Sequence, residues 1–379
     1  MYDVNAHLHT PYSFSAFSSI DEALDLALKE GVKVVGINDF YSMEGYGAWN
    51  AGCMKRGLFP LFGIEFISLN EEDQAAGLRV NDPNNPGRTY ISGKGLNFPV
   101  MLQGEPLRQL QAVRAEANAQ VEQMCAKLND WLKAEGRDLV LDFDEIKEKY
   151  TKGSIRERHL AKALRIALYP DAENPAKVEN ELRSKLLKAG GPAFVPERPE
   201  AFLPMKTVQE IIEAAGGIPT YPFLGDDAKG IFTDFEADLQ KAADTLKKRG
   251  FRSVEFITTR NTTAVLEQYA GYLEDEGFIV TFGSEHNTPA MEPVRLRTRD
   301  ASELSDKLKA INWRGACAVA AHQVGLDSAE AGEEIIEDCI ELGPRSRISS
   351  PFPGNTGATP AMSSPAGGIP PTRMRRSCG

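Results

Sequence analysis

The chain has 379 residues, 42% apolar and 26% charged, enough for one large α/β domain or two medium ones with a sizeable core. The formal net charge of −11 argues against nucleic acid as a partner, because phosphate backbones bind basic surfaces. No apolar run approaches the roughly 18 residues of a membrane span, and the N-terminus carries no basic-then-apolar leader. We therefore expect a cytoplasmic protein that binds no membrane. The five scattered cysteines are never at CxxC spacing and indicate buried thiols rather than disulfides or a zinc site.

The first segment with strand character carries two histidines, His7 and His9. Side chains two residues apart on a strand point to the same face, so both imidazoles can reach one metal ion. The chain has only five histidines, and two of them stand here. The alternative is a surface strand that carries two histidines by chance.

The next 60 residues predict two further strands, each preceded by a helix. The strands are residues 32–37, which lead into Asn38-Asp39-Phe40, and residues 58–66, which carry Glu65 near their end. The helices are expected after a cap at Ser18 or Ser19 and over residues 44–55. Parallel sheets and barrels place their chemistry at the carboxyl ends of strands, so Asp39 and Glu65 are expected near the two histidines.

The regular alternation stops between residues 69 and 205, which we interpret as a mainly helical insertion. Residues 81–88 are typical of turns, and the loop with Arg88, Tyr90 and Lys94 is either a lid over the strand ends or an ordinary surface loop. Helices are expected at residues 105–135, from about 142, at 154–164 and at 174–188.

The alternation resumes after residue 206. Strands are predicted at residues 216–222, 253–257, 278–283 and 316–321, and the last one would bring His322 to the barrel mouth. The total of about seven β/α units favours a barrel over a doubly wound sheet. Residues 343–379 are rich in Pro, Ser and Gly, contain five arginines and no acidic residue, and are predicted to be a disordered tail.

Several short motifs appear in an order that resembles the PHP family (polymerase and histidinol phosphatase). His7-Leu8-His9-Thr10, Asn38-Asp39-Phe40 and Gly63-Ile64-Glu65 resemble the HxH, TDH and GIE motifs of that family. The later matches are Arg158-His159-Leu160-Ala161, which resembles the R-x-H helix, Gly216 to Pro222, Val254-Glu255-Phe256, and Gly283-Ser284-Glu285-His286, which resembles the GSDxH segment. The resemblance covers roughly residues 3–290.

The resemblance implies an α/β fold, a distorted TIM-like (β/α)7 barrel formed by residues 1–68 and 206–342, with the insertion at 69–205. It also implies hydrolysis of a phosphoester by metal-activated water, with a small anionic substrate and divalent Mn, Zn, Fe or Mg as cofactor. The metal ligands it implies are His7, His9, Glu65, His159, Glu285 and His286. Asp39 is either a ligand or a partner of a ligand histidine. Glu255 is either a ligand or a polar residue that closes a barrel layer. The arginines Arg156, Arg158 and Arg260 suit anionic oxygens, although a solvated surface charge is the commoner role of such a residue.

Three residues depart from the family pattern. Phe14, Phe40 and Tyr221 stand where members carry an aspartate and two histidines. Phenylalanine cannot bind a metal ion and tyrosine rarely does, so we expect one or two ions rather than a full set. Two alternatives stay open: a PHP-like barrel that binds a ligand without catalysis, and a metal-dependent hydrolase of a non-phosphate substrate.

Overall fold

The computed structural model describes residues 1–342 and begins with the predicted β-α-β-α-β unit. Its elements are β1 (Asp3–Leu8), α1 (Ile20–Lys29), β2 (Val32–Phe40), α2 (Tyr46–Arg56) and β3 (Phe59–Leu69). The Ser19 side chain caps α1 by accepting from the backbone N–H of Glu22. Strands β1, β2 and β3 pair in parallel, so their carboxyl ends meet at one edge.

The sheet continues through β4 (Arg88–Lys94), β6 (Ile218–Phe223), β7 (Ser253–Ile257) and β8 (Ile279–Gly283). Strand β4 is antiparallel to both of its neighbours, and the other pairs along this order are parallel. After β8 the chain returns to β1, where the His9 N–H donates to the Glu285 carbonyl over 2.7 Å. The result is a nearly closed TIM-like barrel, as predicted. The short β5 (Leu203–Pro204) pairs with β3 outside this order.

Two predictions about individual strands are wrong. Residues 88–94 form barrel strand β4 rather than a lid loop, and Lys94 is buried. Residues 316–321 lie within helix α11 (Asp306–Val324) rather than in a strand. A short apolar run does not distinguish a buried strand from a helix that is buried on most sides, and α11 is of the second kind.

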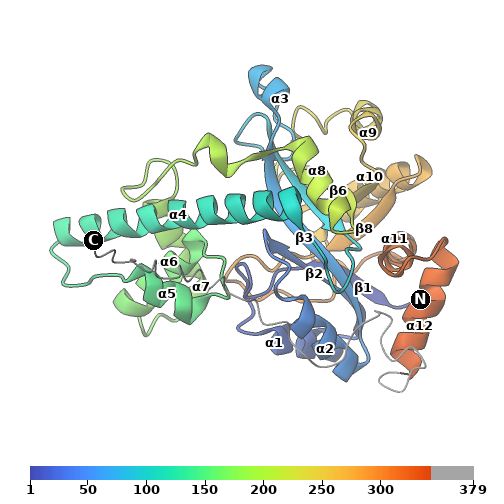
Figure 1. Cartoon of the computed structure of the whole chain (residues 1–379), viewed down its shortest axis with the longest axis horizontal. Helices are drawn as coiled ribbons and strands as arrows, with labels where there is room; N and C mark the ends of the chain where they lie inside the picture. Colours follow the sequence, from blue (N-terminus) through green and yellow to red (C-terminus); the bar gives the residue numbers. More distant parts are fainter. Residues whose placement is uncertain (343–379) are drawn as a thin grey trace, which may run out of the picture.

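The helical part consists of α4 (Gly104–Ala134), α5 (Phe143–Tyr150), α6 (Glu157–Leu168) and α7 (Pro175–Leu182), followed by a π-helical turn, η1 (Arg183–Leu187). In Figure 1 the long helix α4 extends outward from the sheet, and α5, α6 and α7 lie along its outer half. These helices enclose a core of their own, which includes Leu128, Leu132, Leu160 and Leu164. The predicted insertion therefore starts too early, because β4 belongs to the barrel sheet; the division into a barrel and an inserted helical part remains a proposal.

The remaining helices flank the barrel. They are α3 (Glu71–Ala75), α8 (Met205–Ala214), α9 (Leu239–Lys248), α10 (Thr263–Asp275), α12 (Ala329–Leu342) and the short turns η2 (Pro199–Ala201) and η3 (Thr258–Arg260). Across residues 1–342, no helix combines the length and the apolar character that a membrane crossing requires. The expected cytoplasmic location stays a prediction, and the predicted tail at 343–379 lies outside the described residues.

Candidate metal centre

Three side chains from neighbouring strand ends converge at the carboxyl edge of the barrel. His7 is in β1, His9 is the first residue after that strand, and Glu65 is in β3. The His7 and His9 Nε2 atoms are 3.2 Å apart, and Glu65 Oε2 is 3.1 Å from His9 Nε2 and 3.9 Å from His7 Nε2. Within residues 1–342 this is the one group of three or more His, Cys, Asp or Glu side chains close enough to share a metal ion. We call these three residues the candidate triad.

The hydrogen bonds on the far side of each imidazole fix its tautomer. His7 Nδ1 lies 3.0 Å from Glu255 Oε2, and a carboxylate can only accept, so Nδ1 carries the proton. His9 Nδ1 lies 3.0 Å from Ser13 Oγ, whose own proton goes to Asp39 Oδ1 over 2.6 Å. Ser13 therefore accepts from His9 Nδ1. Both histidines present an unprotonated Nε2 toward the centre of the candidate triad.

The amide of Asn38 does not occupy the free position on His7. Asn38 Nδ2 lies 3.3 Å from His7 Nδ1 and 3.2 Å from His7 Nε2. An atom at these two distances in the plane of the imidazole would clash with the ring carbon Cε1, which lies between the two nitrogens. The Asn38 amide nitrogen therefore lies over the face of the ring. The Nε2 lone pair of His7 lies in the ring plane and therefore remains available on the side of His9 and Glu65.

A divalent metal ion fits this arrangement. Glu65 Oε2 is buried and has no hydrogen-bond partner, and the two facing Nε2 atoms have no proton between them. Tetrahedral ligands at metal distances of about 2.0–2.2 Å lie roughly 3.3–3.6 Å from one another, close to the three separations in the candidate triad. Three protein ligands would leave one position for water or substrate, as in catalytic zinc sites.

Burial changes the protonation of the candidate triad in the metal-free protein. Glu65 is only 3% exposed, and this burial raises its pKa to about 8 despite the opposing effect of His7. Burial also lowers the pKa of His9, which keeps its imidazole neutral. A neutral imidazole is the form that binds a metal ion.

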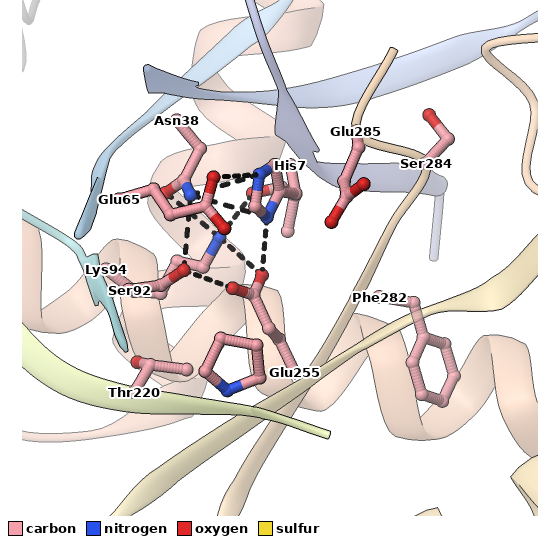
Figure 2. Close-up of polar contacts among 12 residues, drawn as sticks. His7, Asn38, Glu65, Ser92, Lys94, Thr220, Glu255, Phe282, Ser284 and Glu285 are labelled. Carbon is pink, nitrogen blue, oxygen red and sulfur yellow. Dashed lines mark hydrogen bonds and ion pairs between the residues drawn. The ribbon is translucent and has the colours of Figure 1, made fainter. Parts of the chain in front are cut away.

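Behind His7 lies a buried network that the sequence did not reveal. Lys94 Nζ is 2.7 Å from Glu255 Oε2 and also donates to the Ala6 carbonyl and to Asn38 Oδ1, while Ser92 Oγ donates to Glu255 Oε1. Figure 2 shows these side chains from β2, β4 and β7 gathered around His7. Burial alone would raise the pKa of Glu255, but Lys94 and His7 outweigh it and hold the pKa well below its usual value. Glu255 therefore stays ionised and orients His7 rather than reaching the centre itself.

Comparison with known proteins agrees with the fold. Residues 5–150 match the PHP domain family. The structure is also similar to that of a proposed metal-dependent phosphoesterase from Bifidobacterium adolescentis, with 16% identity, a TM-score of 0.57, and 81% of this chain and 94% of that chain covered. An amidohydrolase from Chromobacterium violaceum, with bound sulfate and no metal, gives 17% identity and a TM-score of 0.56 over 82% and 96% of the two chains. No curated protein matches the sequence.

The PHP match confirms the predicted family resemblance, and the two structures support the barrel. At these identities the structural likeness establishes the fold alone. The assignment of individual residues as metal ligands stays a prediction, supported for His7, His9 and Glu65 by their convergence.

The other predicted ligands are not part of the candidate triad. His159 accepts the backbone N–H of Arg156 with Nδ1 over 2.9 Å, and burial lowers its pKa to about 3. Both ring nitrogens of His286 are engaged, Nδ1 by Ser284 Oγ and Nε2 by the Glu292 carbonyl, each at 2.8 Å. Glu285 pairs with Arg260, whose Nη2 donates to both carboxylate oxygens at 2.8 Å each. Figure 2 shows Glu285 on the other side of His7 from Glu65.

Asp39 and Tyr221, like Glu285, have other partners. The Asp39 carboxylate accepts from the Thr10 N–H, the Thr10 hydroxyl and Ser13, so it supports His9 through Ser13. Tyr221 is buried in the barrel core and donates to Glu236 over 2.8 Å. The expectation that His322 lines the mouth is wrong, because it is an exposed residue of α11 that bonds the Gly216 carbonyl before β6 begins.

A cavity of about 500 Å³ lies over this end of the barrel, between the strand ends and the helical part. Glu65 lines it, so the candidate triad adjoins the cavity at its inner end. The wall also includes Phe14 and Phe40, two of the three residues that depart from the family pattern. The basic side chains on the wall are Arg88, Arg156, Arg158, Arg183, Lys188 and Arg260.

Proposed function

We propose that this protein is a metal-dependent hydrolase that cleaves a small phosphoester with water. The observation that carries this proposal is the candidate triad, in which two histidine nitrogens and one carboxylate oxygen without a hydrogen-bond partner converge beside a cavity. A divalent ion held by His7, His9 and Glu65 would lower the pKa of a water molecule for attack and polarise the bond to be cleaved.

The surrounding residues hold the ligands in place. Glu255, itself fixed by Lys94 and Ser92, keeps the proton of His7 on Nδ1, and Ser13 does the same for His9. Such partners orient a ligand imidazole and increase its basicity. We assign Asp39 a positioning role on this ground, because its contacts are to Thr10 and Ser13.

The charge of the cavity wall supports an anionic substrate. The whole chain carries a net charge of −11, whereas the cavity wall carries six basic side chains against five acidic ones, Glu65, Asp82, Glu157, Glu285 and Glu292. Guanidinium groups bind phosphate oxygens through paired donors, and a local excess of positive charge attracts such substrates. A phosphorylated small molecule fits this wall better than a neutral ester does.

The experiment is metal analysis of the purified protein followed by a hydrolysis panel. Each of Mn, Zn and Mg is added to reactions with 4-nitrophenyl phosphate, bis(4-nitrophenyl) phosphate and 4-nitrophenyl acetate. We expect metal-dependent release of nitrophenol from a phosphate substrate, lost in His9→Ala and retained in His322→Ala, which changes an exposed histidine outside the site.

The other outcomes separate the alternatives. Cleavage of the acetate alone would favour a non-phosphate hydrolase. Stoichiometric metal without cleavage of any of the three would favour a binding module. Hydrolysis that survives His9→Ala would contradict the proposed site.

A further inference from the structure

Two arginines of the cavity wall differ from the other basic residues there, because neither has a carboxylate partner. Arg88 pairs with Glu197 at 3.2 Å, Arg183 and Lys188 both pair with Glu157, and Arg260 pairs with Glu285. Among residues 1–342 no ion pair is formed by Arg156 or Arg158, and both are half-buried. Arg158 Nη1 donates to the neutral Asn180 Oδ1 over 3.3 Å, which leaves its charge uncompensated. Their positive charges are therefore available to a ligand in the cavity.

Each of these arginines rests on a phenylalanine that lines the cavity. The Arg156 guanidinium lies 4.7 Å from the centre of the Phe40 ring, and Phe40 in turn stacks on His9 of the candidate triad at 5.2 Å. The Arg158 guanidinium lies 5.6 Å from the Phe14 ring, which contacts His159 edge-on at 4.9 Å. An aromatic face holds a guanidinium by a cation–π contact and leaves its N–H groups free to donate.

The position of the pair is not explained by stability. Arg156 is the N-cap residue of α6 and Arg158 lies in its first turn, where the helix dipole disfavours positive charge. Burial and Arg183 lower the pKa of Arg158 to about 10, so this cation is held at a cost. The pKa of Arg156 is raised instead: burial lowers it, but nearby groups, Glu157 first among them, outweigh the burial. The carboxylate nearest in sequence, Glu157, is already engaged by Arg183 at 2.8 Å and by Lys188 at 3.1 Å.

We propose that Arg156 and Arg158, seated on Phe40 and Phe14, bind the terminal oxygens of a phosphomonoester beside a single metal ion. This inference rests on the proposed function and narrows its substrate class. In two-metal hydrolases the second ion helps to neutralise the phosphoryl oxygens. Here Phe14 and Phe40 cannot bind an ion, and the two guanidinium groups supply the positive charge instead.

The expected selectivity follows from the number of charges. A phosphomonoester is a dianion with three terminal oxygens, which matches two guanidinium groups, whereas a diester carries one charge and two terminal oxygens. The pair therefore favours monoesters. Removal of either arginine should reduce this preference without changing how much metal the protein binds.

The first test uses the metal-free full-length protein and inorganic phosphate, measured by titration calorimetry. Arg156→Met and Arg158→Met should each weaken phosphate binding by about 10–100-fold, the usual value of a hydrogen bond to a charged group. Arg314→Met is the control, since Arg314 is paired with Glu274 and lies on α11, outside the cavity lining. Arg156→Lys keeps the charge without the planar group and should recover binding only in part. It also provides a folded variant if the methionine change unfolds the protein.

The second test compares hydrolysis of 4-nitrophenyl phosphate and bis(4-nitrophenyl) phosphate in the same variants. The ratio of kcat/KM for the monoester to that for the diester should fall in Arg156→Met and stay unchanged in Arg314→Met. Metal content should equal that of the wild type in every variant. If phosphate affinity and this ratio are the same in Arg156→Met, Arg158→Met and Arg314→Met while the wild type binds metal and hydrolyses phosphoesters, the role of the arginine pair is overturned and the proposed function stands. If the wild type binds no metal, the proposed function fails, and the calorimetry on metal-free protein still decides whether the pair binds phosphate.

Discussion

The Lys94 ammonium lies 2.7 Å from the Glu255 carboxylate inside the barrel, where both side chains are almost completely buried. Glu255 also holds the Nδ1 proton of His7. The ion pair thus connects the packing of three strands, β1, β4 and β7, to the orientation of one candidate metal ligand. A change at either residue should affect both stability and metal binding.

Replacement of Lys94 by methionine leaves the Glu255 charge buried without its cation. Loss of one member of a buried ion pair costs about 3–5 kcal/mol, so the free energy of unfolding in urea should fall by this amount. Lys206→Met, at an exposed lysine 3.9 Å from Glu210, should change it by less than about 1 kcal/mol. The double variant Lys94→Met, Glu255→Gln should recover part of the loss. Equal unfolding energies for the two single lysine variants would show that the pair contributes nothing.

Glu255→Gln keeps the size of the side chain but removes the charge that fixes the His7 tautomer. Loss of a hydrogen-bonding partner of a ligand histidine typically weakens metal binding by 10–100-fold, and we expect that loss in a zinc competition assay with a chromogenic chelator. Glu236→Gln is the control, because Glu236 is equally buried but bonds Tyr221 and the backbone of residues 224 and 225. Wild-type zinc affinity in Glu255→Gln would contradict the orienting role.

His159 should make the protein sensitive to acid. Burial lowers its pKa from 6.5 to about 3, so it stays neutral in the folded protein while the unfolded chain takes up a proton below pH 6.5. Because the unfolded state then binds more protons, stability should fall by up to about 1.4 kcal/mol per pH unit between pH 6 and pH 4. His159→Gln, which can still accept from Arg156, should reduce this slope by about one proton.

The control for this experiment is His322→Gln, at an exposed histidine, which should leave the slope unchanged. The measurement is the free energy of unfolding in urea at several pH values for the wild type and both variants. A slope in His159→Gln identical to that of the wild type would mean that His159 is protonated in the folded protein.

The candidate triad could be predicted from the sequence because its signals are local. His7 and His9 lie two residues apart at a strand end, and Glu65 lies in the second half of a buried strand of the same parallel unit. Parallel strands bring their carboxyl ends together without any information from distant parts of the chain. The barrel followed from the same periodic alternation of helices and strands.

The buried position of Lys94 in a barrel strand could not be predicted, because the residues around it resemble a turn. Gly93 and Gly95 flank it, and glycine usually marks a loop. In the structure Gly93 instead makes room for a helix: a Cβ atom there would lie 2.9 Å from the Ile212 side chain of α8. The left-handed backbone conformation at Glu285 and His286, with φ angles of 62° and 58°, could likewise not be predicted from the sequence. Glu285 pairs with Arg260, and His286 bonds Ser284 and Glu292.

The central claim is that His7, His9 and Glu65 together hold one divalent ion. It is tested most directly by elemental analysis of the purified wild type and of Glu65→Gln after dialysis against Zn or Mn. We expect one ion per chain in the wild type and none in Glu65→Gln, with both proteins folded. A wild type that retains no ion, or a Glu65→Gln variant that retains as many ions as the wild type, would contradict it.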